Sequence, residues 1–136
     1  MKKVLLIDDD QDYASLIRMR LEEKGYHIEW DSNPIDAVKR LQKNLDFDVI
    51  ILDVQMPERN GLSTLAHLRG HFKSKNPQGL SIPIIVATGL QSNKLRDIFE
   101  SQEVADYLQK PFDSNVLIAK IEKVVADRNL SEKGSP

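Results

Sequence analysis

Charged residues follow three short apolar runs of the sequence, at the point where each run ends. The runs are Val4–Ile7, Val49–Leu52 and Tyr107–Gln109. Asp8-Asp9-Asp10 follows the first, Asp53 the second, and Lys110 the third. A carboxylate at the end of a buried strand is costly unless it is paired or takes part in chemistry. If the three runs are neighbouring strands, they bring Asp and Lys side chains to one edge of a sheet, which indicates a built site.

The chemistry that such a cluster favours is phosphoryl transfer. Carboxylates about 4 Å apart repel each other by roughly 4 kcal/mol at an effective dielectric constant near 20. A hard divalent cation relieves this repulsion, and Mg²⁺ suits a site with few carboxylates and several waters. With Mg²⁺ and Lys110 present, an Asp carboxylate can attack phosphorus and form an acyl phosphate. Thr88, just after another apolar run, offers a hydroxyl to the phosphoryl oxygens.

The elements that position these residues alternate between short apolar runs and segments of helical spacing. Strands joined through helices imply a parallel sheet with right-handed crossovers and helices on both faces. Runs that are apolar at every position belong inside the sheet, whereas the alternating run Tyr26–Asp31 and the short last run suit its edges. The sequence therefore predicts an α/β fold with a doubly wound, five-stranded parallel sheet of order 2-1-3-4-5, which is flavodoxin-like. Its ligand site lies beyond the carboxyl ends of the strands, where the charged residues fall.

Five helices are expected between and after these strands. Their markers are Tyr13 to Leu21 stopped by Gly25, a start at Asn33-Pro34, a start near Gly61, Leu95 to Phe99, and Leu117 to Val125. Asp10 is expected to cap the first helix, because carboxylates favour helix N-termini. We expect one domain over residues 1–128, followed by a polar, frayed tail or the start of a linker over 129–136.

Composition limits the classes of function. A chain of 136 residues is long enough for one domain, and a net charge of −2 gives no overall basic field for nucleic acid or an anionic membrane. No cysteine is present, and no apolar stretch approaches the roughly 20 residues that span a bilayer. Met1-Lys2-Lys3 leads into an apolar run too short for a signal peptide. We expect a cytoplasmic domain that binds neither nucleic acid nor membrane directly.

Taken together, the motifs resemble the receiver domains of bacterial two-component response regulators, with a chemotaxis-regulator-like fold, over residues 3–128. The resemblance implies that Asp53 is the phosphoacceptor and that Lys110 and Thr88 bind the phosphoryl group. Thr88 would also be the switch hydroxyl, and Tyr107 the switch aromatic. It further implies a cis bond between Lys110 and Pro111.

The resemblance also implies a Mg²⁺ site. Its ligands would be the side chains of Asp9 and Asp53 and the backbone carbonyl of Gln55, with Asp8 acting through water. Gln55 and Leu90 stand at the two variable positions that influence acyl phosphate lifetime in the family.

The implied function is a switch in a two-component phosphorelay. A sensor histidine kinase or a histidine phosphotransfer protein would donate a phosphoryl group to Asp53. The face formed by the fourth helix, fifth strand and fifth helix would then control a downstream partner, an output domain or pairing with a second copy. The chain would not be an enzyme beyond catalysing its own phosphorylation and slow autodephosphorylation. It would either stand alone or form part of a longer regulator.

Several alternatives remain open on the residues alone. Asp8 and Asp10 could be the nucleophile and the general acid-base of a small haloacid-dehalogenase-type phosphatase, although Asp12 replaces the usual Thr or Val. The fold could also serve as an unphosphorylated binding module. His67 and His71 have a spacing that can hold zinc, but no third ligand is evident. The basic residues Lys39, Arg40 and Lys43 are interpreted as a solvated helix face.

Overall fold

The computed structural model describes residues 2–53, 55–56, 59–60, 82–89 and 104–134. For Thr88 and for residues 55–60 and 129–134, only the backbone within those ranges is described. The predicted third and fourth helices lie outside the described residues, and so do His67, His71 and Leu90.

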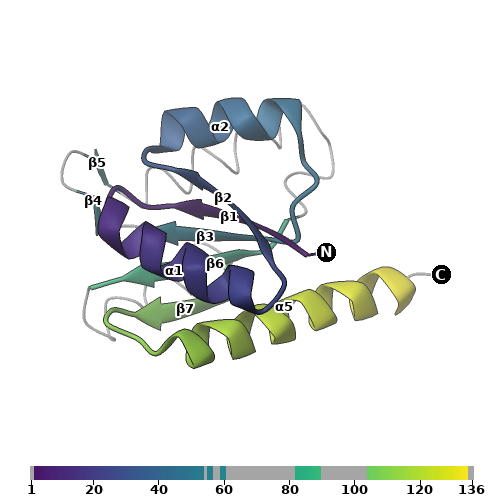
Figure 1. Ribbon diagram of the computed structural model, residues 1–136. Helices are drawn as coiled ribbons and strands as arrows, with labels where there is room; N and C mark the ends of the chain where they lie inside the picture. The colour runs from purple at the N-terminus through teal and green to yellow at the C-terminus, as the bar shows by residue number, and fades with distance from the viewer. Residues whose placement is uncertain (1, 54, 57–58, 61–81, 90–103, 135–136) are drawn as a thin grey trace.

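Five parallel strands form the central sheet, in the order β2-β1-β3-β6-β7. The strands are β1 (Lys3–Ile7), β2 (His27–Asp31), β3 (Val49–Asp53), β6 (Ile84–Thr88) and β7 (Asp106–Gln109). Every strand pair in this sheet is parallel. This is the predicted order 2-1-3-4-5, with β2 and β7 at the edges, so the prediction of a doubly wound fold is confirmed (Figure 1).

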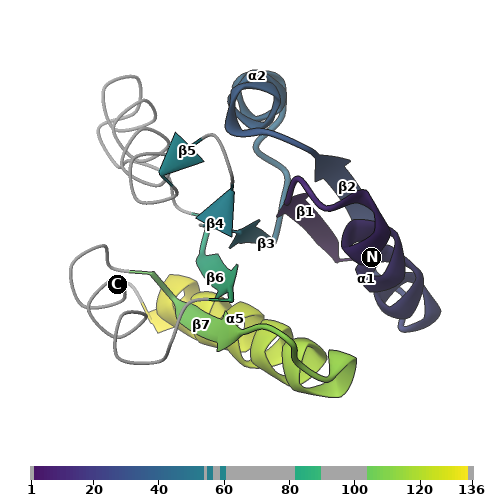
Figure 2. The same cartoon turned by 90° about the vertical axis from the view of Figure 1, so that its left-hand side faces the viewer.

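Helices cover both faces of the sheet. Those among the described residues are α1 (Gln11–Glu23), α2 (Pro34–Lys43) and α5 (Ser114–Gly134). Figure 2 shows α1 and α5 together on one side of the sheet and α2 on the other. Because both faces are covered, all five residues of β3 are buried, as a uniformly apolar run predicts.

Alternate residues of the strands belong to two separate hydrophobic cores, one on each face of the sheet. Val4 and Leu6 of β1 belong to the cluster that includes residues of α1 and α5. Leu5 and Ile7 belong to the cluster that includes residues of α2. Successive side chains of a strand point to opposite faces, so one short apolar strand contributes to both cores. Packing in these two cores positions the strand ends, which the charged residues follow.

Local signals fix the starts of the first two helices. The Asp10 side chain accepts a hydrogen bond from the Tyr13 backbone N–H at 3.0 Å, which confirms Asp10 as the cap of α1. Asn33 caps α2 in the same way, with Pro34 in its first turn. After α1, Gly25 has φ +89°, a conformation that glycine adopts without strain.

Two backbone features differ from the expectation. A short antiparallel hairpin of β4 (Gln55–Met56) and β5 (Arg59–Asn60) follows β3 and was not predicted. The helix α5 continues to Gly134, so helical backbone runs through most of the segment 129–136 that was expected as a frayed tail or the start of a linker. No proline or glycine interrupts residues 112–133, so nothing in the backbone chemistry stops the helix earlier. The domain boundary at residue 128 itself stays a prediction.

Candidate functional site

The register of the strands brings the predicted site residues to one edge of the sheet. Asp53, the last residue of β3, is paired with Ala87, one residue before the end of β6. Thr88 is paired with Gln109, the last residue of β7, and Lys110 comes next. Asp8 follows β1, which lies on the other side of β3. The carboxyl ends of four neighbouring strands therefore deliver the acidic and basic residues together.

Three carboxylates and one ammonium form the centre of the site. Asp8, Asp9 and Asp53 each offer an oxygen, and these oxygens all lie within 4.8 Å of one another. Lys110 Nζ donates to Asp8 Oδ2 at 2.7 Å and lies 3.6 Å from Asp53 Oδ2. Asp8 and Asp53 are buried, with 1% and 4% of their surfaces exposed, whereas Asp9 is exposed. Two carboxylates of the cluster are therefore buried, and the third, that of Asp9, is open to solvent.

Every polar group of Asp8 has a hydrogen-bond partner. Its backbone N–H donates to the Asp31 carbonyl at 3.1 Å, and its own carbonyl accepts from Trp30 Nε1 at 2.7 Å. Its Oδ1 accepts from the Asp10 backbone N–H at 2.9 Å, and its Oδ2 accepts from Lys110. Fully satisfied buried polar networks hold one geometry, so β2 and the start of α1 fix this carboxylate.

The charges of the cluster favour a hard cation. Carboxylates at this separation repel each other by about 3 kcal/mol per pair at an effective dielectric constant of 20. One lysine cannot balance three carboxylates, so the described side chains leave an excess of negative charge. Oxygen donors with access from solvent are the ligand set that Mg²⁺ takes in proteins. The donor set therefore fits the magnesium ion that the sequence predicted.

The other residues predicted for the site are Thr88, Gln55, Tyr107 and the bond between Lys110 and Pro111. Thr88 ends β6, and Gln55 begins β4 two residues after Asp53. Tyr107 of β7 is half-buried and packs against the core on the α2 side. The bond between Lys110 and Pro111 is cis, as the resemblance implied. The switch roles of Thr88 and Tyr107 and the carbonyl contribution of Gln55 stay predictions.

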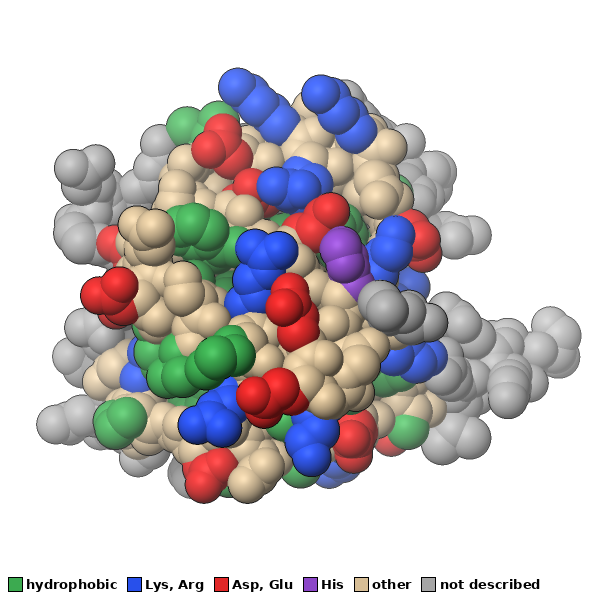
Figure 3. All heavy atoms as spheres, viewed as in Figure 1, with side chains coloured by type: hydrophobic (Ala, Val, Ile, Leu, Met, Phe, Trp, Pro, Cys, Tyr) green, Lys and Arg blue, Asp and Glu red, His purple; other side chains and the backbone are tan. Residues whose placement is uncertain are grey.

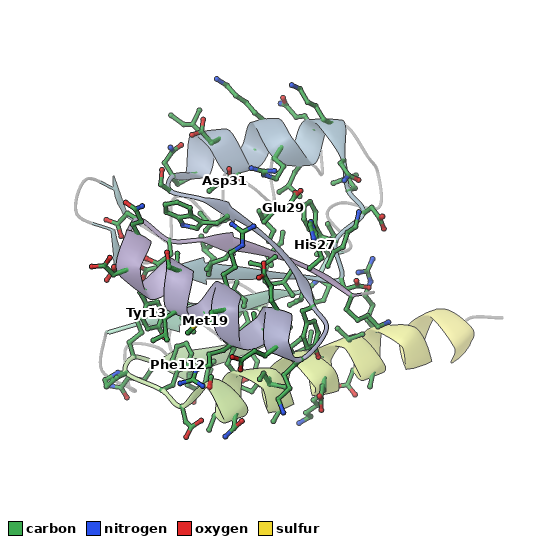
Figure 4. All side chains as sticks on the ribbon, viewed as in Figure 1. Tyr13, Met19, His27, Glu29, Asp31 and Phe112 are labelled. Atoms are coloured by element: carbon green, nitrogen blue, oxygen red, sulfur yellow. The ribbon has the colours of Figure 1, made fainter. Side chains whose placement is uncertain are left out.

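An ion-pair network beside the site was missed by the sequence analysis. Arg40 Nε and a terminal nitrogen donate to both oxygens of Asp31 at 2.8 and 3.0 Å. Its other terminal nitrogen donates to Glu29 at 2.9 Å. Lys39 and Lys43 are exposed, as expected of a solvated helix face, whereas Arg40 is only partly exposed and pairs with Glu29 and Asp31 of β2, which Figure 4 labels. The hydrogen bonds that Arg40 donates to Asp31, with the charges of both carboxylates, raise the pKa of Arg40.

Substituting Arg40 by methionine is expected to lower the free energy of unfolding by about 2 kcal/mol, because a buried carboxylate loses its charge-assisted hydrogen bonds. The Asp31 side chain is only 8% exposed and cannot recover those bonds from bulk water. Urea unfolding followed by circular dichroism measures the change. Lys43→Met on the same helix is the matched control, since Lys43 is exposed and should change stability by under about 0.5 kcal/mol. Equal losses in the two variants would contradict the assignment.

Tyr13 is a second residue whose contacts the sequence did not predict. It was expected only as part of the buried stripe of α1. Its ring centroid lies 4.2 Å from Lys110 Nζ, and its ring meets Phe112 edge to face at 5.7 Å. Figure 4 shows Tyr13 at the start of α1 and Phe112 on the segment before α5. Burial, with the charges of Asp8 and Asp53, raises the pKa of the Tyr13 hydroxyl. Its position on the first turn after Asp10 indicates only that it lies near the acidic residues, and not that its ring contacts Lys110.

The outer surface near α1 mixes charges of both signs. Figure 3 shows basic and acidic side chains interspersed on this face, with hydrophobic side chains between them. Leu16 and Met19 of α1 are about half exposed, at 45% and 51%. On this face, the described residues therefore present no concentrated basic field. In the part of the chain that the structure describes, no helix is both long and apolar enough to cross a membrane.

Comparison with known proteins places this geometry in a family. The sequence profile described as "Response regulator receiver domain" matches residues 4–122. The chain is 32% identical over 133 residues to the transcriptional regulatory protein CpxR of Escherichia coli strain K12, a match that covers 98% of this chain and 53% of that protein. It is 34% identical over 127 residues to the transcriptional regulatory protein CrdR of Helicobacter pylori, covering 93% of this chain and 56% of that protein.

Solved structures agree with these matches. The Vibrio cholerae chemotaxis protein CheY4 superposes with a TM-score of 0.77 and 28% identity, covering 91% of this chain and 98% of that one. The chain spans about half the length of the curated relatives it matches.

Proposed function

This chain belongs to the response regulator receiver domain family, and on that premise we propose that it accepts a phosphoryl group on Asp53 and uses it as a signalling switch. The donor is the phosphohistidine of a sensor histidine kinase or of a histidine phosphotransfer protein. The observation that carries the proposal is the buried Asp53 carboxylate, which lies within 3.6 Å of the Lys110 ammonium and beside Asp8 and Asp9. A nucleophile, a cation and acidic ligands at one sheet edge are the parts that phosphoryl acceptance needs.

In the proposed reaction, an Asp53 oxygen attacks the phosphorus of the donor. A bond forms between that oxygen and phosphorus, and the bond from phosphorus to the donor nitrogen breaks. The electron pair of the broken bond stays on the imidazole of the donor, and Asp53 carries the acyl phosphate. Lys110 contributes positive charge next to the carboxylate that reacts, where it stabilises the oxygens of the group in transfer.

Magnesium completes the proposed site. Asp9 and Asp53 would hold it with their side chains, Gln55 with its backbone carbonyl, and Asp8 through water. When bound, Mg²⁺ neutralises charge on the phosphoryl oxygens during transfer. The hydrogen bonds of Asp8 to Asp10, Trp30 and Lys110 keep that carboxylate in place without the metal. The site is thus organised by the chain's own residues before any ligand arrives.

The proposed output is a change in the populations of two surface arrangements. The Thr88 hydroxyl binds the phosphoryl group, and Tyr107 moves inward as the end of β6 shifts. The face formed by the fourth helix, β7 and α5 then docks a downstream partner, an output domain or a second copy of the chain. The relatives CpxR and CrdR are transcriptional regulatory proteins, and the matches to this chain cover 53% and 56% of them, which supports control of an attached output domain.

The first test is incubation with acetyl phosphate and Mg²⁺, followed by intact mass measurement. We expect a gain of one phosphoryl mass that chelation of the metal by EDTA prevents. Beryllofluoride binding provides a second readout if hydrolysis is fast. The same samples should show almost no turnover of p-nitrophenyl phosphate, because we propose that the chain is not a general phosphatase. Failure to gain mass and to bind beryllofluoride would favour the unphosphorylated binding module.

The phosphatase alternative receives no support from the geometry of Asp10. Its carboxylate accepts a hydrogen bond from the Tyr13 backbone N–H and caps α1. This hydrogen bond engages the Asp10 carboxylate with the backbone of α1, which is the structural role of a helix cap.

A further inference from the structure

We propose that Tyr13 is a positioning residue that holds the Lys110 ammonium over its ring, between Asp8 and Asp53, in the geometry that phosphoryl transfer uses. The inference rests on the proposed function and goes beyond it by adding an aromatic side chain from α1 to the working parts of the site. The Tyr13 hydroxyl has no hydrogen-bond partner among the described residues, and its backbone N–H donates to Asp10, which is not one of the proposed metal ligands. Tyr13 acts through Lys110, and its effect is therefore on where the positive charge sits.

The contacts of Lys110 define what the ring does. Its Nζ donates to Asp8 Oδ2 at 2.7 Å, lies 3.6 Å from Asp53 Oδ2, and lies 4.2 Å from the centroid of the Tyr13 ring. An aromatic face attracts a cation but accepts no conventional hydrogen bond from it. The ring therefore localises the ammonium without engaging the N–H groups that a phosphoryl oxygen needs. The Lys110 side chain is 19% exposed, so most of it is shielded from bulk water.

The ring is fixed from both sides of the site. The backbone N–H of Tyr13 donates to Asp10 Oδ1 at 3.0 Å, which anchors the residue to the acidic segment after β1. Its edge-to-face contact with Phe112, at an interplanar angle of 88°, ties it to the segment that carries Lys110. The acidic segment and the segment of Lys110 are far apart in the sequence but in contact in the fold, since Asp8 and Lys110 are 102 positions apart. Tyr13 thus connects the loop of the carboxylates to the loop of the lysine through one rigid side chain.

The hydroxyl is not the working part of this residue. Tyr13 Oη is buried and has no hydrogen-bond partner among the described residues. A buried hydroxyl without a partner is a cost to the fold and gives nothing to the site. The cation lies over the ring, and phenylalanine offers the same aromatic face. Tyr13→Phe, which keeps the ring, and Tyr13→Leu, which removes it, are therefore expected to differ in phosphorylation rate.

The test compares rates of phosphorylation by acetyl phosphate at saturating Mg²⁺, read by intact mass. Tyr13→Leu is expected to lower the rate constant about 3- to 30-fold, the range that corresponds to a partly desolvated cation–π contact. Tyr13→Phe is expected to stay within about 2-fold of wild type and to unfold at higher temperature, since it removes the unpartnered hydroxyl. Tyr26→Leu is the matched control, because Tyr26 packs against the same core as Tyr13 but far from Lys110. It should leave the rate unchanged.

Two further measurements distinguish positioning from a general loss of structure. The dissociation constant for Mg²⁺, titrated through the fluorescence of Trp30, should stay within about 2-fold in Tyr13→Leu, because the ring is not a ligand. In a Lys110→Met background, followed over long incubations, Tyr13→Leu should change the rate by less than about 2-fold, because its effect passes through the lysine.

The outcomes separate the inference from the function on which it rests. If wild type is phosphorylated but Tyr13→Leu slows the reaction equally with and without Lys110, the positioning role is wrong and the proposed function stands. An equal loss in Tyr13→Phe and Tyr13→Leu would also overturn it, by assigning the effect to the hydroxyl. If wild type gains no phosphoryl group and binds no beryllofluoride, the proposed function fails first and this inference fails with it.

Discussion

Asp53→Asn is expected to abolish phosphorylation, so that incubation with acetyl phosphate and Mg²⁺ adds no phosphoryl mass. The amide lacks the anionic oxygen that attacks phosphorus, and it also removes one charged ligand from the acidic cluster. Asparagine has nearly the shape of aspartate, so the fold around this buried position should be retained. Circular dichroism and the unfolding temperature check that the variant is folded before its mass is compared with wild type.

Asp10→Asn is the matched control for this result, because it makes the same chemical change at a neighbouring acidic residue. Asparagine caps helices as well as aspartate does, so α1 should be unaffected. The receiver proposal expects full phosphorylation of Asp10→Asn, whereas a phosphatase that uses Asp10 as its acid-base would lose activity. Phosphorylation of Asp53→Asn at a rate near that of wild type would refute Asp53 as the acceptor.

Lys110→Met is expected to slow phosphorylation at least about 100-fold, the usual cost of removing one group that stabilises charge in a transition state. Lys110 Nζ is the only ammonium among the described residues within 4 Å of both Asp8 and Asp53. Without it, the described residues place no ammonium beside these two buried carboxylates, so the metal alone would have to offset the charge of an incoming phosphoryl group. Methionine keeps much of the volume of the lysine stem, so the loss reports on charge more than on packing. Time courses of intact mass give the ratio of rates.

Lys120→Met provides the comparison within the same chain. Lys120 Nζ also pairs with a carboxylate, Asp106 Oδ1, at 3.1 Å, but on α5 and away from the acidic cluster. Its loss should leave the phosphorylation rate within about 2-fold of wild type, because surface ion pairs contribute little. Similar losses in Lys110→Met and Lys120→Met would mean that net charge, and not the placement of Lys110, sets the rate.

The order of the strands was predictable because burial leaves a direct record in the sequence. A strand covered on both faces is apolar along its buried length, as β3 is from Val49 to Leu52, and such strands lie inside the sheet. In β2, Ile28 and Trp30 face the core that contains α1 and α5, while Asp31 lies on the other side of the strand. That alternation placed β2 at an edge. Asp10, Asn33 and Gly25 similarly marked helix ends through local backbone chemistry.

The features that the sequence analysis missed or misjudged depend on particular neighbours. The hairpin of β4 and β5 consists of two-residue strands, too short to leave a periodic pattern. The ion pair between Arg40 and Asp31 was not predictable, because the sequence does not show which basic residue of α2 contacts the end of β2. The polar composition after residue 128 suggested fraying, but α5 continues through it.

The sequence by itself determined which chemical groups the chain places at the carboxyl ends of its strands, since each charged residue directly follows an apolar run and parallel strands end at one edge. Only the tertiary structure decided how those groups meet. The bond from Lys110 to Asp8 joins residues 102 positions apart, and the bond from Trp30 to the Asp8 carbonyl joins residues 22 apart. Such contacts depend on the packing angles of helices and the rotamers of long side chains. No local pattern encodes these, and so the ring of Tyr13 beneath Lys110 could be found only in the folded chain.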